Sequence, residues 1–301
     1  MRIFITGGTG FIGKFVVEKL QKDGHHLLVH VLEKGSAKIF FRSSKNIRVV
    51  FGTLSNINHL KPILNRFKPD ATIHLAWEGI PRFDAETSSK NLIQGLKLVA
   101  LLAEIGCKLF IGAGSCWEYG RNRGRVSENM IPTSFSAFTA AKYALYTLGT
   151  EIAKEKGMRF VWARFFFVYG PGQRDGSLIP SAVLSAKNGQ ALELKNPNRA
   201  NDFIYVMDVA DAIALFIKKH RTVSAGVYNI GSGHLTAVQD IIKKVCIRCG
   251  VTYKNKSVDK KFVGFYADIS KIRNSIGWRP HTKIREGISV TIDYYKNLKK
   301  S

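Results

Sequence analysis

Residues 6–13 read Thr-Gly-Gly-Thr-Gly-Phe-Ile-Gly, and this segment decides how the rest of the chain is interpreted. It follows an apolar run at residues 3–6 that is typical of a buried strand. It also opens a stretch, residues 11–22, whose apolar residues recur at helical spacing. A glycine-rich turn between a strand and a helix is the setting in which proteins bind the pyrophosphate of a dinucleotide.

Each glycine of the triplet has a separate physical role in such a turn. Gly7 permits the tight turn, Gly10 lets the backbone approach the pyrophosphate, and Gly13 allows the helix to pack on the strand. The free N–H groups that open the helix then face the phosphates. We therefore predict a dinucleotide cofactor at this turn, and we assign Phe11 and Ile12 to the same site.

The choice between NAD and NADP stays open at this stage. A carboxylate about 20 residues beyond the glycine turn would bind the 2′-hydroxyl of the adenosine ribose. Glu33 falls there and would repel a 2′-phosphate, but Lys34 follows directly, with Lys38 and Arg42 nearby, and these cations would attract it.

Apolar runs alternate with segments of helical spacing along most of the chain. This alternation predicts an α/β fold, a Rossmann-type doubly wound parallel sheet covered by helices. Beyond about residue 171 the pattern loosens, so we expect a dinucleotide-binding domain at 1–171 and a smaller, interwoven C-terminal α/β lobe at 172–301. Strands are expected at 27–32, 71–76, 109–113 and 160–167, and helices at 60–67, 89–105, 137–156, 209–220 and 235–249.

The composition restricts the classes of protein to consider. Of 301 residues, 45% are hydrophobic, yet no apolar run approaches the roughly 20 residues that a membrane span needs. The N-terminus enters a strand at once, so we expect a cytoplasmic protein with no membrane partner. The net charge of +24 favours anionic ligands, but it is spread along the chain, so we do not expect nucleic acid. Cys246 and Cys249 lack a second pair at zinc spacing, and we interpret them as helix residues and predict no metal.

Seven motifs in one order resemble the extended short-chain dehydrogenase/reductases, the NAD-dependent epimerase/dehydratase family that acts on nucleotide sugars. The likeness covers nearly the whole chain, and such an ordered set is highly specific. The motifs stand at residues 6–13, 69–76 (Pro-Asp-Ala-Thr-Ile-His-Leu-Ala), 114–120 (Gly-Ser-Cys-Trp-Glu-Tyr-Gly), 164–171 (Arg-Phe-Phe-Phe-Val-Tyr-Gly-Pro), 202–208 (Asp-Phe-Ile-Tyr-Val-Met-Asp), 228–233 and 276–280.

The resemblance implies catalysis by a Ser or Thr, a Tyr and a Lys, the last two as Y-x-x-x-K on one helix. A tyrosine whose pKa is lowered by a nearby cation can move the proton that accompanies hydride transfer. Ser115 and Lys142 match the hydroxyl and lysine positions, but Phe138 stands where the family has tyrosine. The resemblance also places Leu75, Ala76, Lys142 and Phe165 at the cofactor.

Phe138 leaves three explanations open, because a phenyl ring has no proton to give. In the first, the chain is an engineered Tyr→Phe form of an active enzyme. In the second, another group such as Tyr143, Tyr146 or a water moves the proton. In the third, the protein is a natural binder without oxidoreductase activity. Tyr146 lies one helical turn beyond Lys142, although a packing role is its simpler interpretation.

On the substrate side, the resemblance implies a nucleotide-diphosphate sugar held by the C-terminal part of the chain. Arg174 and Arg199 are candidates for the diphosphate, and Trp77 and Trp117 for the sugar pocket. Phe167 takes a place where the family often has asparagine.

The sequence around Ser115 is most similar to that of the 4-ketoreductases of deoxysugar and lipopolysaccharide biosynthesis, such as CDP-abequose or dTDP-fucose synthases. We therefore expect reduction of a 4-keto-6-deoxy sugar nucleotide with NAD or NADP. An epimerase or dehydratase with tightly bound NAD is the alternative, and a non-catalytic NAD(P)-binding protein or an RNA-binding relative is a further one. The family implies a homodimer formed by two long helices of each subunit.

Overall fold

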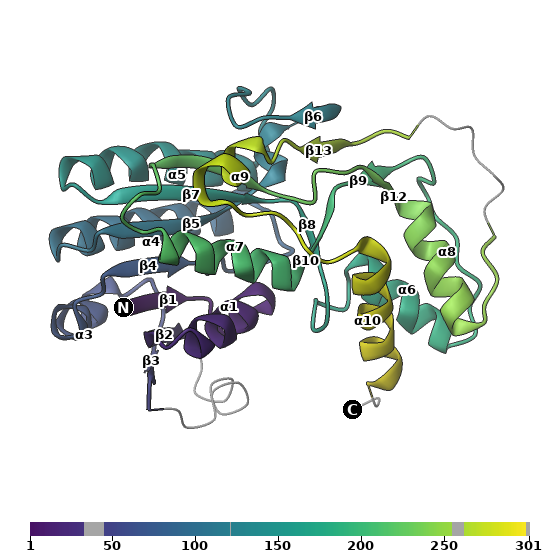
Figure 1. The fold of residues 1–301 in the computed structure, drawn as a ribbon, viewed down its shortest axis with the longest axis horizontal. Coiled ribbons are helices and arrows are strands. Elements are labelled where there is room, and N and C mark those ends of the chain that lie inside the picture. The colour runs from purple at the N-terminus through teal and green to yellow at the C-terminus, as the bar shows by residue number, and fades with distance from the viewer. Residues whose placement is uncertain (33–44, 121, 255–261, 299–301) are drawn as a thin grey trace.

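A seven-stranded parallel sheet forms the centre of the computed structural model, which describes residues 1–32, 45–120, 122–254 and 262–298 (Figure 1). The strand order is β3-β2-β1-β4-β5-β7-β11. This order confirms the predicted doubly wound α/β fold. The strands are β1 (Arg2–Thr6), β2 (His26–Val31), β3 (Ile47–Phe51), β4 (Ala71–His74), β5 (Leu109–Ser115), β7 (Arg159–Phe165) and β11 (Gly226–Ile230).

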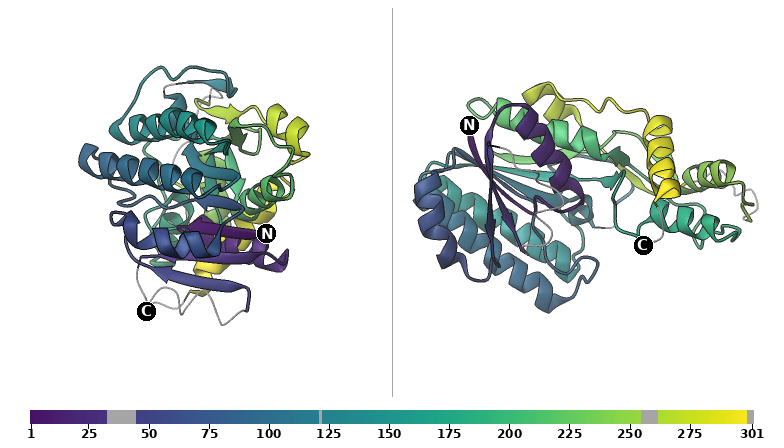
Figure 2. Two further views of the ribbon diagram at one scale, coloured as in Figure 1. Left: turned by 90° about the vertical axis from the view of Figure 1, so that its left-hand side faces the viewer. Right: turned by 90° about the horizontal axis from the view of Figure 1, so that it is seen from below.

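Helices cover both faces of this sheet, which explains why its strands are apolar on both sides. Ile3 and Ile5 of β1 pack into one layer, whereas Phe4 between them packs into the other, and all three are fully buried. Figure 2 shows the two layers at the sides of the sheet. The first contains α1 (Phe11–Lys22), α7 (Val206–Lys218) and α9 (Ser270–Ile276), and the second α3 (Leu60–Phe67), α4 (Ala85–Glu104) and α5 (Ala137–Glu155).

A second lobe lies beyond the carboxyl ends of the strands (Figure 1). Its core is formed by α6 (Leu178–Lys187), α8 (Val238–Cys249) and α10 (Ile284–Asn297), which meet through buried side chains such as Val183, Val245 and Ile292. Short strand pairs connect it to the sheet: β8 (Phe167–Tyr169) with β10 (Phe203–Tyr205), β9 (Ala200–Asn201) with β12 (Thr236–Ala237), and β6 (Gly124–Val126) with β13 (Phe265–Ala267).

The two halves of the chain interleave. Helix α7 packs against α1, and β11 forms the edge of the main sheet beside β7, although both come from beyond residue 171. The sheet therefore draws on both parts of the chain.

Several expected elements have other bounds in the structure. The helices expected at 209–220 and 235–249 are α7 (Val206–Lys218) and α8 (Val238–Cys249), and the strand expected at 71–76 ends at His74. The single strand expected at 160–167 is wrong, because β7 ends at Phe165 and Phe167 begins β8 in another sheet. The chain changes partners there: the Phe166 N–H donates to the Ile230 carbonyl, and the Phe167 N–H to the Asp202 carbonyl. The helix expected at 89–105 starts earlier, at Ala85, because the Asp84 carboxylate caps it by accepting from the Thr87 N–H.

Strands β3 and β11 of the main sheet and helices α6, α9 and α10 were not predicted, whereas α3 has the predicted bounds. Cys246 and Cys249 lie on α8 as free thiols, which confirms their interpretation as helix residues.

Candidate functional site

A pocket of about 900 Å³ lies at the carboxyl ends of the strands, between the sheet and the second lobe. In parallel sheets all carboxyl ends reach the same edge, and this is where open α/β folds bind ligands. The pocket extends from the glycine loop after β1, past the ends of β4 and β5, to α6 and β10 of the second lobe.

The glycine loop forms one end of this pocket. At Gly7 and Gly13 the neighbouring backbone lies too close to leave space for a side chain. Gly7 has a φ of 72°, which favours glycine, and a Cβ there would lie 2.6 Å from the Ala76 nitrogen. A Cβ on Gly13 would lie 2.0 Å from the Gly7 carbonyl oxygen. Helix α1 has no side-chain cap and no acidic residue in its first turn, so its opening N–H groups are left for another acceptor. The loop therefore fits a dinucleotide pyrophosphate.

The ribose-binding carboxylate expected near the cofactor cannot be placed, because Glu33, Lys34, Lys38 and Arg42 lie outside the described residues. In the described part of β2 and its end, His30 and Leu32 line the pocket. The other cofactor candidates, Phe11, Ile12, Leu75, Ala76 and Phe165, all line it.

Ser115 ends β5 and is held by the short 3-10 helix η2 (Cys116–Tyr119) that follows. Its hydroxyl accepts from the Trp117 N–H at 3.2 Å, and its own N–H donates to Glu118 Oε1 at 2.6 Å. Glu118 is fully buried and also accepts from Arg164 Nε and Trp162 Nε1, each at 3.0 Å. A buried ion pair thus fixes the backbone of Ser115 at the pocket wall.

Helix α5 places Phe138 and Lys142 one turn apart on the same wall. The Lys142 Nζ donates to the Ala113 carbonyl at 2.6 Å and lies 4.0 Å from the centre of the Trp77 ring. Burial lowers the pKa of Lys142 to about 7, although Glu118 acts in the opposite direction. Ser115, Phe138 and Lys142 are therefore brought together, as the sequence motifs predict.

Four rings form an aromatic cluster beside these residues: Trp77, Phe83, Trp117 and Phe138. The ring centres of Phe83 and Phe138 lie 4.9 Å apart, and those of Phe83 and Trp117 5.4 Å apart. All four line the pocket. Sequence analysis found the two tryptophans but missed Phe83, whose only signal is an aromatic residue in a turn-rich segment after Pro81.

Two histidines that sequence analysis missed also line the pocket, His30 near the end of β2 and His74 at the end of β4. His74 Nδ1 lies 2.7 Å from the Thr6 hydroxyl, and burial lowers the pKa of His74 to about 3. Burial also lowers the pKa of His30 to about 4. Both are therefore neutral at physiological pH. The sequence signal that could have identified these two histidines is a polar residue near the end of an apolar run.

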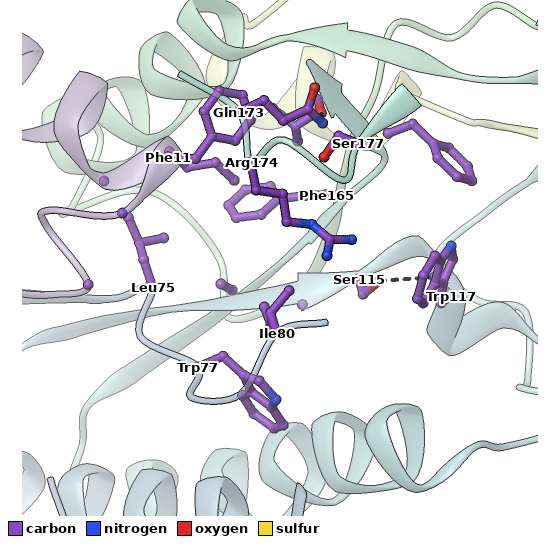
Figure 3. A pocket seen from close by; sticks show the side chains of 18 of the residues that line it. Phe11, Leu75, Trp77, Ile80, Ser115, Trp117, Phe165, Gln173, Arg174 and Ser177 are labelled. Carbon is purple, nitrogen blue, oxygen red and sulfur yellow. Dashed lines mark hydrogen bonds between the residues drawn. The ribbon is translucent and has the colours of Figure 1, made fainter. Parts of the chain in front are cut away.

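The side of the pocket toward the second lobe carries the predicted substrate residues. Phe167, Arg174 and Arg199 all line it, and both arginines are exposed. In Figure 3 the Arg174 side chain extends from the loop after β8 into the pocket, on the side where Ser115 and Ile80 lie. The described contacts give the Arg174 guanidinium no carboxylate partner, so its charge is available to a ligand.

Tyr143 and Tyr146, the alternative proton donors, do not line the pocket. Tyr143 contacts Phe135 and Tyr146 instead, and Tyr146 also contacts Trp162. Across the described ranges, no helix is long and apolar enough to cross a membrane.

Comparison with known proteins gives a consistent result. The model of the NAD dependent epimerase/dehydratase family matches residues 3–231. UDP-glucuronic acid decarboxylase 3 of Arabidopsis thaliana is 26% identical over 314 residues, which cover 96% of this chain and 87% of the relative.

Two solved structures share the fold. UDP-glucose 4-epimerase of Thermotoga maritima, with UDP-glucose, has a TM-score of 0.84 at 24% identity and covers 98% of this chain and 99% of its own. A Tyr→Phe mutant of UDP-glucuronic acid 4-epimerase from Bacillus cereus, with NAD and a fluorinated UDP-glucuronic acid, has a TM-score of 0.86 at 21% identity, covering 99% and 100%.

Proposed function

This chain belongs to the NAD dependent epimerase/dehydratase family, and from that premise we propose that it holds NAD and a nucleotide-diphosphate sugar in the pocket between its two lobes. The reaction proposed is oxidation or reduction at a carbon of the sugar ring, of the epimerase or dehydratase type. The observation that carries the proposal is that the glycine loop, Ser115 with Lys142, and two arginines line one continuous pocket. Along the cleft, the glycine loop would face the cofactor pyrophosphate, Ser115 and Lys142 the reacting carbon, and the two arginines the anionic groups of the substrate.

The residues of the chain divide the work along this pocket. When bound, NAD would accept a hydride from the sugar carbon and return it. The loop at Gly7, Gly10 and Gly13 would hold the cofactor pyrophosphate. A Cβ at Gly7 or Gly13 would collide with the loop's own surroundings, and one at Gly10 would face the ligand. The Ser115 hydroxyl would position the sugar oxygen, since Glu118 keeps its backbone fixed. The Lys142 amine would bond the nicotinamide ribose.

We further propose a nucleotide-linked uronic acid as the substrate. Arg174 projects an exposed guanidinium into the pocket toward the end where Ser115 lies, so it fits a carboxylate on the sugar. Arg199 is then left for the diphosphate. The Arabidopsis and Bacillus relatives carry UDP-glucuronic acid in their names, which supports this choice. The aromatic cluster supplies apolar surface for the faces of the sugar ring.

The 4-ketoreductase activity expected from the sequence around Ser115 stays a prediction. The family description and the relatives above favour an epimerase or decarboxylase. A reductase must exchange its cofactor, whereas an epimerase regenerates it. Cofactor retention therefore separates the two, and NAD, not NADP, is the cofactor that the family description supports.

Mass analysis of nucleotides released from the purified protein tests the cofactor, and calorimetry with UDP-glucuronic acid and UDP-glucose tests the substrate. We expect retained NAD and tighter binding of the uronic acid. Product analysis after incubation with UDP-glucuronic acid should show a changed sugar. The proposal would be contradicted if the purified protein held no NAD and also showed no affinity for added NAD or NADH.

A second candidate, a binding protein without turnover, is favoured by Phe138 alone. It predicts binding of both ligands with no change in the sugar. Phe138→Tyr should then give no turnover either, whereas in an enzyme impaired only by the missing phenol it should raise the rate.

The homodimer also stays a proposal. Helices α4 and α5 pack side by side, and Ile93 and Leu148 on them are each 53% exposed. Two such helices from each subunit would bury these side chains in a four-helix interface. Sedimentation of the purified protein tests this.

A further inference from the structure

The pocket poses a chemical problem, because hydride transfer to or from an alcohol carbon requires a proton transfer at its oxygen. Phe138 supplies no proton, and neither Tyr143 nor Tyr146 lines the pocket. The titratable side chains among the described lining residues are His30, His74, Glu78, Cys116, Lys142, Tyr169, Arg174 and Arg199.

Most of these groups are engaged or unable to accept a proton. His74 is bonded to Thr6, and burial lowers its pKa to about 3. Glu78 is ion-paired with Lys90 at 2.8 Å. Burial raises the pKa of Cys116 well above its usual range, so its thiol stays protonated. Guanidinium groups do not lose their proton in proteins.

Tyr169 and His30 are excluded for similar reasons. Burial raises the pKa of Tyr169 far above its usual range, and the tyrosine sits on β8, against Phe203 and Tyr205. His30 is on β2, beside His59, and not on the elements that carry Ser115 and Phe138.

Lys142 is the remaining group, and it lies at the required place. Its Nζ is 5.7 Å from the centre of the Phe138 ring. It therefore lies near the place where a tyrosine hydroxyl at this position would meet the sugar oxygen. It bonds the carbonyl of Ala113, two residues before Ser115 on β5. Aromatic rings of Trp77, Phe138 and Trp162 surround it.

The charges around Lys142 leave its amine without a carboxylate partner in the described residues. Glu118 on η2 raises its affinity for a proton, but this carboxylate is already bonded to Arg164, Trp162 and the Ser115 N–H. The Arg164 guanidinium on β7 is itself paired with that same carboxylate. His74 on β4 is neutral. A buried amine in such surroundings exchanges its proton readily near neutral pH.

We propose that the Lys142 amine itself exchanges the proton with the reacting hydroxyl of the sugar, in place of the phenol that Phe138 lacks. This inference rests on the proposed function. In the oxidative direction the C–H bond of the alcohol carbon would break, and NAD, when bound, would accept its hydride. The O–H bond breaks as the C=O bond forms, and the proton goes to the lone pair of neutral Lys142, which becomes an ammonium group. Reduction reverses each transfer, so the amine is regenerated.

The first test needs no substrate. Lysine labelled with carbon-13 at Cε is followed by NMR through a pH titration of the whole protein, and the Lys142 signal is identified as the one missing in Lys142→Arg or Lys142→Met. We expect its midpoint at about 7, against about 10.4 for an ordinary lysine. A midpoint near the ordinary value would overturn the proposal.

The second test follows formation of reduced nicotinamide in a single turnover with NAD and UDP-glucuronic acid. We expect the rate to rise with pH to about 7 and then to level, because the neutral amine is the base. Lys142→Arg keeps the charge but cannot accept a proton, so it should lower the rate about 10²- to 10⁴-fold.

The Phe138→Tyr background makes this test specific to proton transfer. In that variant a phenol can exchange the proton, so Lys142→Arg should lower the single-turnover rate much less than it does in the protein with Phe138. Equal losses in both backgrounds would show that Lys142 only positions the cofactor and would overturn the proposal. Tyr146→Phe is the control, and it should leave the rate and the pH profile unchanged. If neither NAD nor UDP-glucuronic acid binds at all, the proposed function fails, while the NMR titration still decides the state of the amine.

Discussion

Nε of Arg164 lies 3.0 Å from Oε2 of Glu118, and the two side chains are 2% and 0% exposed. The pair connects β7 to the turn that follows β5 and supports the backbone of Ser115. Such a pair contributes less through its own attraction than through the penalty that follows when one member is lost.

Glu118→Ala should therefore destabilise the fold strongly, because it leaves the Arg164 guanidinium buried without a counter-charge. We expect a loss of about 3–5 kcal/mol in the free energy of unfolding. Asp70→Asn removes a carboxylate from an exposed pair with Arg2 and should cost at most about 1 kcal/mol. Urea denaturation of both variants measures the difference, and similar losses would contradict the assigned role of burial.

The glycine loop allows a graded test of cofactor binding. A Cβ on Gly13 would lie 2.0 Å from the Gly7 carbonyl oxygen, whereas one on Gly10 would lie 3.2 Å from the same atom. Gly13→Ala should therefore distort the loop and lower both stability and NAD affinity. Gly10→Ala should keep the fold and lower NAD affinity alone, because its methyl group would meet the pyrophosphate. Circular dichroism and calorimetry with NAD separate these outcomes, and unchanged affinity in Gly10→Ala would remove the loop from the cofactor site.

The two arginines should differ in the ligand group that they recognise. Arg174→Met should weaken binding of UDP-glucuronic acid by tenfold or more, equivalent to about 1.4 kcal/mol, and change binding of UDP-glucose little. Arg199→Met should weaken both, since both carry the diphosphate. Calorimetry of each variant with UDP-glucuronic acid and with UDP-glucose gives the four dissociation constants to compare with those of the unchanged protein. Equal losses for both ligands in Arg174→Met would instead assign Arg174 to the diphosphate.

The buried amine should also make stability depend on pH. The pKa of Lys142 is lowered to about 7 in the folded chain, whereas an unfolded lysine has a pKa near 10.5. The unfolded state therefore binds more protons between these values, and the penalty of charging the buried amine is full below about pH 7 and fades as pH rises toward 10.5. Lys142→Met should then stabilise the protein by a few kcal/mol at about pH 6 and by less at about pH 9. Thermal unfolding at both pH values measures this, and a gain that grows with pH would contradict it.

The features that the sequence predicted are local in the chain. The glycine loop, the bounds of α3 and the one-turn spacing of Phe138 and Lys142 depend on residues close together, where strand, turn and helix preferences act directly. The change of sheet after Phe165 was not predictable in this way, because it depends on acceptors at Ile230 and Asp202 far along the chain.

By itself, then, the sequence determined a parallel α/β fold with a glycine-rich loop at its start and a serine and a lysine at one pocket. Only the tertiary structure decided what surrounds the amine of that lysine. Trp77, Phe83 and the Glu118–Arg164 pair come from separate segments that meet because parallel strands end at one edge of the sheet. Burial and the pairing of charges depend on that meeting, and they set the proton affinity of a side chain more strongly than its neighbours in the chain do.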